Sequence, residues 1–450
     1  MTTLIHRYLP LIIYLGYFVF VWFCLLISPV EYKDFDYSST FLYTLAIIIL
    51  FTCGYGIGAS GPLTLAVAYG DRFLRYQSNR LFFRLLMTLG VVGAIAQWYG
   101  FAESSGSLDL ASIGKNYVSG YEGYERGQAS IGLAYVANIA NQALATIILL
   151  AGLYYFGAMN LADRAIFLFI LGTYLLTNVI GTGKQKFLGD IVIFLFYCAV
   201  LNFTARGKQL RTRTLFLSAL SIVAVFALFV EILRQRYVAA GIGLHNFYEK
   251  SHPLISWDDN SWLSNLLSSD YLFAAGVFSS YFTNGLYGLY LSLTLPFEWS
   301  YLIGNSYSVG RIVEIMLGSD GAILQRTYPY RVGETYGWGF DKWHSLFAWL
   351  ASDFTFIGVL ALTLVFGFIY ARLWRQALHA STFFAGPLFI FLSQGLIFSF
   401  ANNQVVHALS GVIVLVVLSG AQLLYFLVEA LRAACREPCH GKTEGLGTNE

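Results

Sequence analysis

Two polar sequences, Glu231-Ile-Leu-Arg234-Gln-Arg236-Tyr237 and Trp338-Gly-Phe-Asp-Lys-Trp-His344, bound the stretch that decides the fold of this 450-residue chain. Between them runs the only long segment that does not have the composition of a membrane span. The chain before and after it consists of long apolar runs joined by short links. We therefore expect a bundle of membrane helices that holds residues 231–344 at one face of the membrane.

The composition places the chain among membrane proteins. Hydrophobic residues make up 57% of the sequence and charged residues 12%, whereas a soluble domain carries roughly 25% charged residues. Because lipid cannot hydrogen-bond to the backbone, a chain that crosses a bilayer forms either helices or a closed barrel. The apolar runs are continuous rather than alternating at every second residue, which favours helices. The sequence therefore predicts an all-α polytopic membrane protein, and its net charge of +2 does not indicate nucleic-acid binding.

The apolar runs are numerous enough for about ten transmembrane helices, since one crossing takes about 20 residues. The predicted spans are 8–28, 41–59, 81–101, 131–157, 166–180, 187–204, 215–230, 346–370, 382–400 and 405–431. Four regions follow: transmembrane helices 1–7 in residues 1–230, a large loop in 231–344, helices 8–10 in 345–432, and a tail in 433–450.

Lysine and arginine in the links set the orientation, because short cytoplasmic loops are enriched in both. In this chain they gather in even-numbered links and in the tail: Arg72, Arg75, Arg80, Arg84, Arg206, Lys208, Arg211, Arg213, Arg372, Arg375, Arg432 and Arg436. Both termini are therefore predicted to be cytoplasmic and the 231–344 loop to lie on the outer side. A full span over residues 270–297 would break this alternation, so we interpret that segment as an interfacial or re-entrant helix.

Four basic residues lie on the outer side, where basic residues are usually rare. Lys184 and Lys186 follow two glycines in the turn Gly181-Thr-Gly-Lys-Gln-Lys186, and Arg234 and Arg236 lie where the seventh span emerges. Guanidinium groups bind phosphate oxygens in bidentate fashion, and glycines let a ligand approach the backbone. The pattern predicts a phosphate or pyrophosphate site. The alternative is that these side chains are snorkelling anchors at helix ends.

Several residues on the same side are candidates for a general base. Asp190 and Glu231 lie beside the cations, and we interpret them mainly as neutralising partners. Within the loop, no spacing selects one residue among His245, Glu249, His252, Glu298, Glu314, Glu334, Asp341 and His344. We select His344, which lies among aromatic residues where the loop returns to the membrane, and Glu334 as a second candidate. The abundant aromatic residues, 17% of the chain, are explained by interfacial belts or, alternatively, by a sugar-stacking surface.

The loop returns to the membrane through Trp343-His-Ser-Leu-Phe-Ala-Trp-Leu-Ala-Ser-Asp353-Phe-Thr-Phe-Ile-Gly358. Together with the Gly-Thr-Gly-Lys-Gln turn, the Leu-Arg-Gln-Arg-Tyr exit and the large outer loop, this segment resembles the oligosaccharide repeat-unit (O-antigen, Wzy-type) polymerases. That family has Asp-Phe-Gly-x-x-Gly in the returning segment, and Thr355 stands here at the position of its first glycine. Lys184 stands where the family often has arginine.

The resemblance implies an inverting, metal-independent membrane glycosyltransferase of the C type that uses no cofactor. Such an enzyme polymerises undecaprenyl-pyrophosphate-linked oligosaccharides at the periplasmic face of the bacterial inner membrane, for O-antigen, capsule or exopolysaccharide. Its implied partners are a lipid-linked glycan donor and acceptor, the bilayer and a chain-length regulator protein, with no nucleic acid. The alternatives are an O-antigen ligase and a non-enzymatic transporter of lipid-linked glycans.

The resemblance also implies a role for each site residue. The residues expected to bind the pyrophosphate are Lys184, Lys186, Arg234 and Arg236. Fixed cations there would stabilise the charge that develops on the leaving group, so Arg234 is counted among the catalytic residues. His344 or Glu334 would then accept the proton of the acceptor hydroxyl.

Overall fold

A computed structural model describes residues 2–60, 68–103, 108–109, 112–118, 133–181, 185–206, 212–247, 252–319, 321–340 and 342–436. Within these residues, eight helical segments are long and apolar enough to cross a membrane. They are α1 (Thr2–Ile27), α2 (Tyr37–Gly58), α4 (Arg80–Glu103), α6 (Leu133–Tyr155), α7 (Leu161–Leu175) with its π-helical continuation η3 (Leu176–Ile180), α8 (Gln185–Arg206), α14 (Leu346–Leu378) and α16 (Leu409–Arg436). The prediction of an all-α, membrane-embedded protein is confirmed at this level.

The other two predicted spans are also helical. Helix α9 (Thr212–Ala239) has 28 residues, enough for a crossing, whereas α15 (Ala385–Phe398) has 14. At 1.5 Å per residue α15 is about 21 Å long, which is shorter than the hydrocarbon core of about 30 Å. Its residues from Ala385 to Phe391 are buried, so neighbouring helices enclose it. The count of ten crossings therefore stays a prediction.

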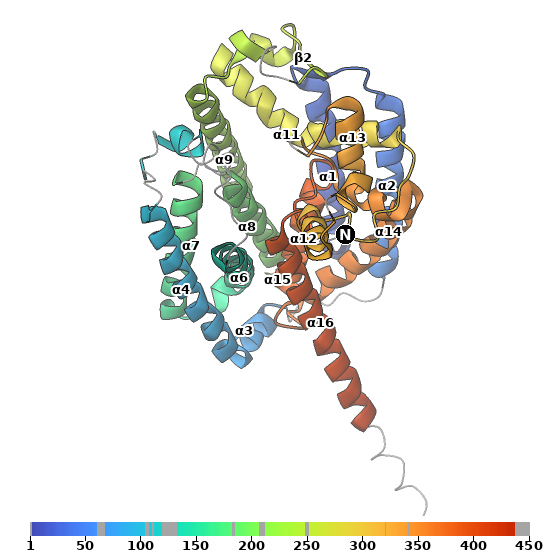
Figure 1. The fold of residues 1–450 in the computed structure, drawn as a ribbon. Helices are drawn as coiled ribbons and strands as arrows, with labels where there is room; N and C mark the ends of the chain where they lie inside the picture. The colour runs from blue at the N-terminus through green and yellow to red at the C-terminus, as the bar shows by residue number, and fades with distance from the viewer. Residues whose placement is uncertain are drawn as a thin grey trace, which may run out of the picture.

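The links between helices gather at two opposite ends of the bundle. At one end, Arg75 Nε donates a hydrogen bond of 3.0 Å to the Ala380 carbonyl, so the link after α2 lies beside the link after α14. At the other end, strand β1 (Val30–Tyr32) pairs antiparallel with β2 (Ile255–Trp257). Figure 1 shows β2 and helix α3 (Ala68–Ser78), which carries Arg75, at opposite ends of the molecule. We name these the loop end, which holds β1 and β2, and the arginine end, which holds α3.

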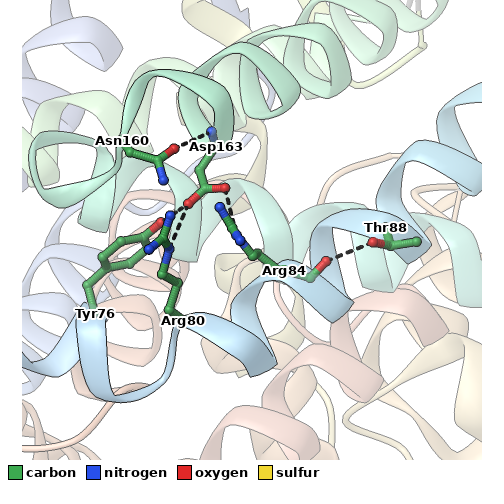
Figure 2. Close-up of polar contacts among 6 residues, drawn as sticks. All are labelled: Tyr76, Arg80, Arg84, Thr88, Asn160 and Asp163. Carbon is green, nitrogen blue, oxygen red and sulfur yellow. Dashed lines mark hydrogen bonds and ion pairs between the residues drawn. The ribbon is translucent and has the colours of Figure 1, made fainter.

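A buried carboxylate organises the arginine end (Figure 2). Asp163, in the first turn of α7, is 2% exposed. It accepts a hydrogen bond from the Tyr76 hydroxyl at 2.5 Å and one from Arg84 Nε at 3.0 Å. Arg80 Nε lies 3.5 Å from the same carboxylate, and the Asn160 side chain caps α7 by accepting the Asp163 N–H at 2.8 Å. Two cations on α4 are thus fixed against the start of α7 by one anion.

Helices α2 and α14 pack with their backbones in contact. A Cβ atom on Gly54 would lie 1.9 Å from the Leu364 carbonyl oxygen, and one on Gly367 would lie 2.3 Å from the Phe51 carbonyl oxygen. Small residues at helix interfaces permit such close approach, which is a common source of packing energy between membrane helices. The two helices are therefore closely packed, and the N-terminal end of α14 adjoins α11 through the Ser345 N–H and the Gly285 carbonyl.

Helix α11 (Ser269–Leu293) keeps both of its ends at the loop end. Near its start, the Tyr271 hydroxyl donates a 3.2 Å hydrogen bond to Glu231 at the end of α9. Just past its end, the Thr294 hydroxyl lies 2.8 Å from the Tyr336 hydroxyl. Figure 1 shows α11 running from the side of α9 toward the side of α13 at the end that holds β2. The interpretation of residues 270–297 as an interfacial or re-entrant helix stays a prediction.

The rest of the large loop folds into short elements over the loop end. They are η4 (Leu244–Asn246), η5 (Trp262–Asn265), α12 (Tyr307–Leu317), η6 (Leu324–Arg326) and α13 (Tyr328–Tyr336).

Candidate functional site

Three segments from distant parts of the sequence meet at the loop end. The buried side chains of Ile113, Val179 and Ile232 form one apolar cluster, which joins η3 and α9 to a short helix at residues 113–118. Asn116 Nδ2 donates a 2.9 Å hydrogen bond to the last carbonyl of η3. The exits of the fifth and seventh predicted spans are therefore neighbours, with the 113–118 helix between them.

This meeting point carries four described cations, which we name the exit cluster: Lys115, Lys186, Arg234 and Arg236. Lys184, the fourth cation predicted from the sequence, lies outside the described residues. The sequence interpretation missed Lys115 because its link reads as glycine-rich and acidic. Its spacing gives no apolar period that would have predicted a helix docked beside η3.

Lys186 is exposed and paired with the first buried acid of α8. Its Nζ lies 2.6 Å from Asp190 Oδ2, one helical turn further on. The other oxygen of Asp190 accepts a 2.5 Å hydrogen bond from Gln394 Nε2 on α15. Asp190 therefore ties α8 to α15 and balances the charge of Lys186, as expected for a neutralising partner.

Arg234 is held by a bidentate ion pair on its own helix. Its Nε and Nη2 donate to the two oxygens of Glu231 at 2.9 and 2.8 Å, and the Tyr271 hydroxyl donates to the same carboxylate. The hydrogen bonds from Arg234, with smaller contributions from other neighbours, lower the pKa of Glu231 to about 2. The pair is thus ionised at any physiological pH, and the guanidinium has a fixed orientation. Both side chains are about 30% exposed, at 28% and 32%, so a ligand can reach them.

Arg236 lies in an aromatic enclosure built from three segments. Its guanidinium carbon is 3.4 Å from the ring centre of Tyr117, on the 113–118 helix. Burial raises the pKa of Tyr281 on α11, and the adjacent Arg236 opposes that rise. Tyr281 in turn stacks on Trp343, with ring centres 4.7 Å apart. A cation beside aromatic faces can hold an anion and, next to it, an apolar sugar face.

His344 is enclosed by protein. It is 1% exposed, and its Nε2 lies 3.1 Å from the Gly339 carbonyl oxygen. Its ring packs on Gly288 of α11, where a Cβ atom would approach Nδ1 to 2.8 Å. It adjoins Trp343 and hence the aromatic enclosure of Arg236. Its assignment as a base stays a prediction, and proton transfer to it would require a path past these contacts.

The structure separates the other loop candidates by their surroundings. Glu314 is fully buried and accepts two backbone N–H groups at the start of η6, at 2.9 and 2.7 Å. His252 Nε2 lies 2.9 Å from the carbonyl of the α13 C-cap residue. Both are fixed by the backbone of the loop, whereas His245 is exposed. Glu249 and Asp341 lie outside the described residues.

Glu334 lines a cavity of about 660 Å³ at the far end of α11. The lining residues are Glu298, Tyr301, Gly321, Ala322, Gln325, Arg326, Tyr330 and Glu334. Glu298 is paired with Arg331 Nε at 3.2 Å, and the guanidinium of Arg326 lies 5.0 Å from the ring centre of Tyr301. The cavity therefore combines carboxylates, a guanidinium, an amide and phenol rings.

Glu334 and the exit cluster adjoin different parts of α11. Arg236 contacts Tyr281 in the middle of α11, whereas α13, which carries Glu334, meets the end of α11 where Thr294 contacts Tyr336. Those 13 residues of helix correspond to about 20 Å at 1.5 Å per residue. Glu334 is connected more closely to His344, because Gly333 packs on Gly339, whose carbonyl oxygen lies 3.1 Å from His344 Nε2.

Asp353 holds a strained loop next to the cavity. This buried carboxylate accepts hydrogen bonds from the Ser300 hydroxyl at 2.6 Å, the Asn305 N–H at 2.8 Å and the Asn305 side-chain amide at 3.0 Å. Between these anchors, Tyr301 and Leu302 both adopt positive φ angles, 63° and 62°. Residues other than glycine rarely adopt this backbone conformation, and it persists only where the surroundings impose it.

Helix α14 is broken two residues after Asp353. Thr355 has φ 62° and ψ 163°, a conformation that is essentially restricted to glycine. Its hydroxyl accepts the Gly358 N–H at 3.2 Å and so caps the second part of the helix. The break lies at the position where the sequence resemblance has glycine in place of threonine.

The fold and its sites define a polytopic α-helical membrane protein with a cationic cluster and a polar cavity at one end. Searches of the chain against protein-family models, curated proteins and solved structures found no match.

Proposed function

We propose that the protein is a membrane glycosyltransferase that polymerises undecaprenyl-pyrophosphate-linked oligosaccharide repeat units at the periplasmic face of the inner membrane. One observation carries this proposal: the exits that bear Lys186, Arg234 and Arg236 adjoin each other at the loop end. Cations on neighbouring segments at a membrane boundary suit a lipid-borne diphosphate, because its charged group lies at the depth of the helix ends.

The orientation follows from the distribution of basic residues. The arginine end gathers the basic links on α3, α4 and α14, and such links are normally cytoplasmic. The exit cluster is at the opposite end of the bundle. A carrier-linked glycan on the outer leaflet would therefore meet the cluster directly.

The main requirement of the proposed reaction is a site that binds the departing pyrophosphate. The oxygen of an acceptor hydroxyl attacks the anomeric carbon of the donor sugar, and the bond from that carbon to the pyrophosphate oxygen breaks with inversion. The electron pair leaves with the pyrophosphate, which stays on its carrier lipid, and the hydroxyl proton passes to a base. Fixed cations accelerate this step by stabilising the negative charge as it develops.

The residues around Arg236 suit the sugar next to that pyrophosphate. Tyr117 and Tyr281 lie beside the guanidinium, and Trp343 stacks on Tyr281. His344 adjoins Trp343, which stacks on Tyr281 beside Arg236. We therefore assign the proton transfer in this site to His344 rather than to Glu334.

The test is a gel of surface polysaccharide from a strain that lacks the gene. We expect the long-chain ladder to disappear while a band with a single repeat unit is retained. Complementation with Arg234→Ala or Arg236→Ala should reduce the ladder at least tenfold at normal protein level. Lys33→Ala removes an exposed cation at the same end but outside the exit cluster, and it should restore the ladder fully.

The same gel separates the alternatives. A ligase or a transporter of lipid-linked glycans would lose the single-repeat band together with the ladder. A full ladder from both arginine variants would remove these residues from the mechanism.

A further inference from the structure

The cavity at the end of α11 lies apart from the exit cluster and has its own chemistry. We propose that it is an oligosaccharide-binding site, with Tyr301 as the stacking face and Gln325, Arg326 and Glu334 as hydrogen-bonding groups. Its volume of about 660 Å³ lies within the range of ordinary ligand pockets. The proposal rests on the proposed function only for the identity of the glycan that reaches the cavity.

The lining offers both donors and acceptors without a net charge. Glu298 is neutralised by Arg331, whose Nη1 also donates to the Pro296 carbonyl at 2.7 Å. Glu334 and Arg326 line the same cavity, and neither forms an ion pair with any residue that the structure describes. One open carboxylate and one open guanidinium suit the hydroxyl groups of a neutral or zwitterionic glycan. A phosphate or a polyanion would require the cationic excess that the exit cluster has and this cavity lacks.

Hydrogen bonds hold the aromatic residue of the cavity, Tyr301, in a strained backbone conformation. Tyr301 has a positive φ angle, and its loop is fixed by the hydrogen bonds of Ser300 and Asn305 to Asp353. Arg326 lies over the Tyr301 ring. Strained backbone conformations that the surrounding contacts impose are common at binding sites. Asp353 is therefore a positioning residue, which presents Tyr301 to the cavity without touching the ligand.

We assign the cavity to the sugars of the substrate that do not react, because the cavity and the exit cluster adjoin different parts of α11. Between Tyr281, beside Arg236, and Thr294, beside α13, α11 is about 20 Å long, a length that a short oligosaccharide covers. Binding energy from such remote parts of a substrate contributes to orienting the reacting part. Removal of this site should therefore weaken substrate binding before it affects the transfer step itself.

The experiment uses the full-length protein in nanodiscs and a defined probe. The probe is the lipid-free repeat-unit oligosaccharide, released by mild acid from the strain that expresses the gene and labelled at its reducing end. We expect saturable binding by microscale thermophoresis, weakened at least tenfold by Tyr301→Ala and by Glu334→Gln. Tyr301→Phe keeps the stacking face and should bind within threefold of the unaltered protein, which excludes misfolding as the cause.

The control is Trp262→Ala, which removes a 62% exposed aromatic side chain at the loop end, outside the cavity lining. This variant should bind the probe normally. Absence of saturable binding, or equal binding by Tyr301→Ala, would overturn the proposal. Binding that is lost in the cavity variants while the gene deletion leaves the ladder intact would keep the site and reject the polymerase function.

Discussion

The carboxylates of Asp163 and Glu231 fix arginines at the two ends of the bundle in different ways. Glu231 is partly exposed and holds Arg234 at a surface that a ligand can reach. Because its pKa is lowered to about 2, its contribution to stability is complete above its ordinary pKa and is lost only as the pH falls toward 2. Asp163 is buried beneath Arg80 and Arg84 and faces no ligand site. The exposed Glu231–Arg234 pair is suited to ligand binding, whereas the buried Asp163 holds α4 against α7.

Replacement of Asp163 with asparagine should destabilise the arginine end. The amide keeps the shape but cannot neutralise Arg80 and Arg84, and it accepts fewer of the three hydrogen bonds and ion contacts. We expect a loss of about 2–3 kcal/mol in the free energy of unfolding, because partners of a buried charge are left uncompensated. A thermal unfolding scan in detergent measures this effect. Asp259→Asn, at an exposed position, is the matched control, and an equal melting temperature for both variants would contradict the account.

Among the elements, α14 combines a rigid half and a strained start. Its glycine contacts with α2 are backbone to backbone, while its N-terminal part carries Asp353 and the break at Thr355. The strained conformation lies beside the loop that presents Tyr301. This juxtaposition links the helix break to the cavity rather than to the exit cluster.

Thr355→Gly tests whether that break is strained. Glycine relieves a conformation that costs about 1–3 kcal/mol for other residues. Two effects oppose this gain. Loss of the Thr355 cap costs a few tenths of a kcal/mol, and the greater conformational entropy of glycine in the unfolded state costs about 0.4–1 kcal/mol. We therefore expect a melting temperature that is unchanged or higher. Thr363→Gly, in the regular part of the same helix, loses a few tenths of a kcal/mol of helix propensity and the packing of a buried side chain, and should lower stability by about 1 kcal/mol. An equal decrease in both variants would show that Thr355 is not strained.

The positions of the helices could be predicted from the sequence, but the relation of the loop candidates could not. Twenty-residue apolar runs and alternating basic links are encoded locally, and every predicted span contains a helix. The sequence also predicted a site between the exits of the fifth and seventh spans, and η3 packs against α9 there. It missed Lys115 and Tyr117, whose short helix has no apolar period. Sequence spacing also could not predict that Gly333, next to Glu334, packs on Gly339, whose carbonyl oxygen lies 3.1 Å from His344 Nε2.

In the whole molecule, the two ends of the bundle differ in how their basic residues are held. The arginine end joins α3, α4, α7 and α14 through buried pairs and carbonyl contacts. The loop end keeps its cations on three adjoining segments, and α11 contacts one of these segments at Glu231. If the arginine end is cytoplasmic, the exit cluster faces the periplasm.

Cysteine labelling of intact cells tests this central claim most directly. In a variant whose five native cysteines are replaced by alanine, Lys115→Cys and Lys186→Cys would each be treated with a membrane-impermeant maleimide. Gln77→Cys, at an exposed position of α3, serves as the arginine-end control. We predict labelling of both exit-cluster positions in intact cells, and labelling at position 77 only after the inner membrane is permeabilised. Labelling of position 77 in intact cells, with both exit-cluster cysteines protected, would contradict the account.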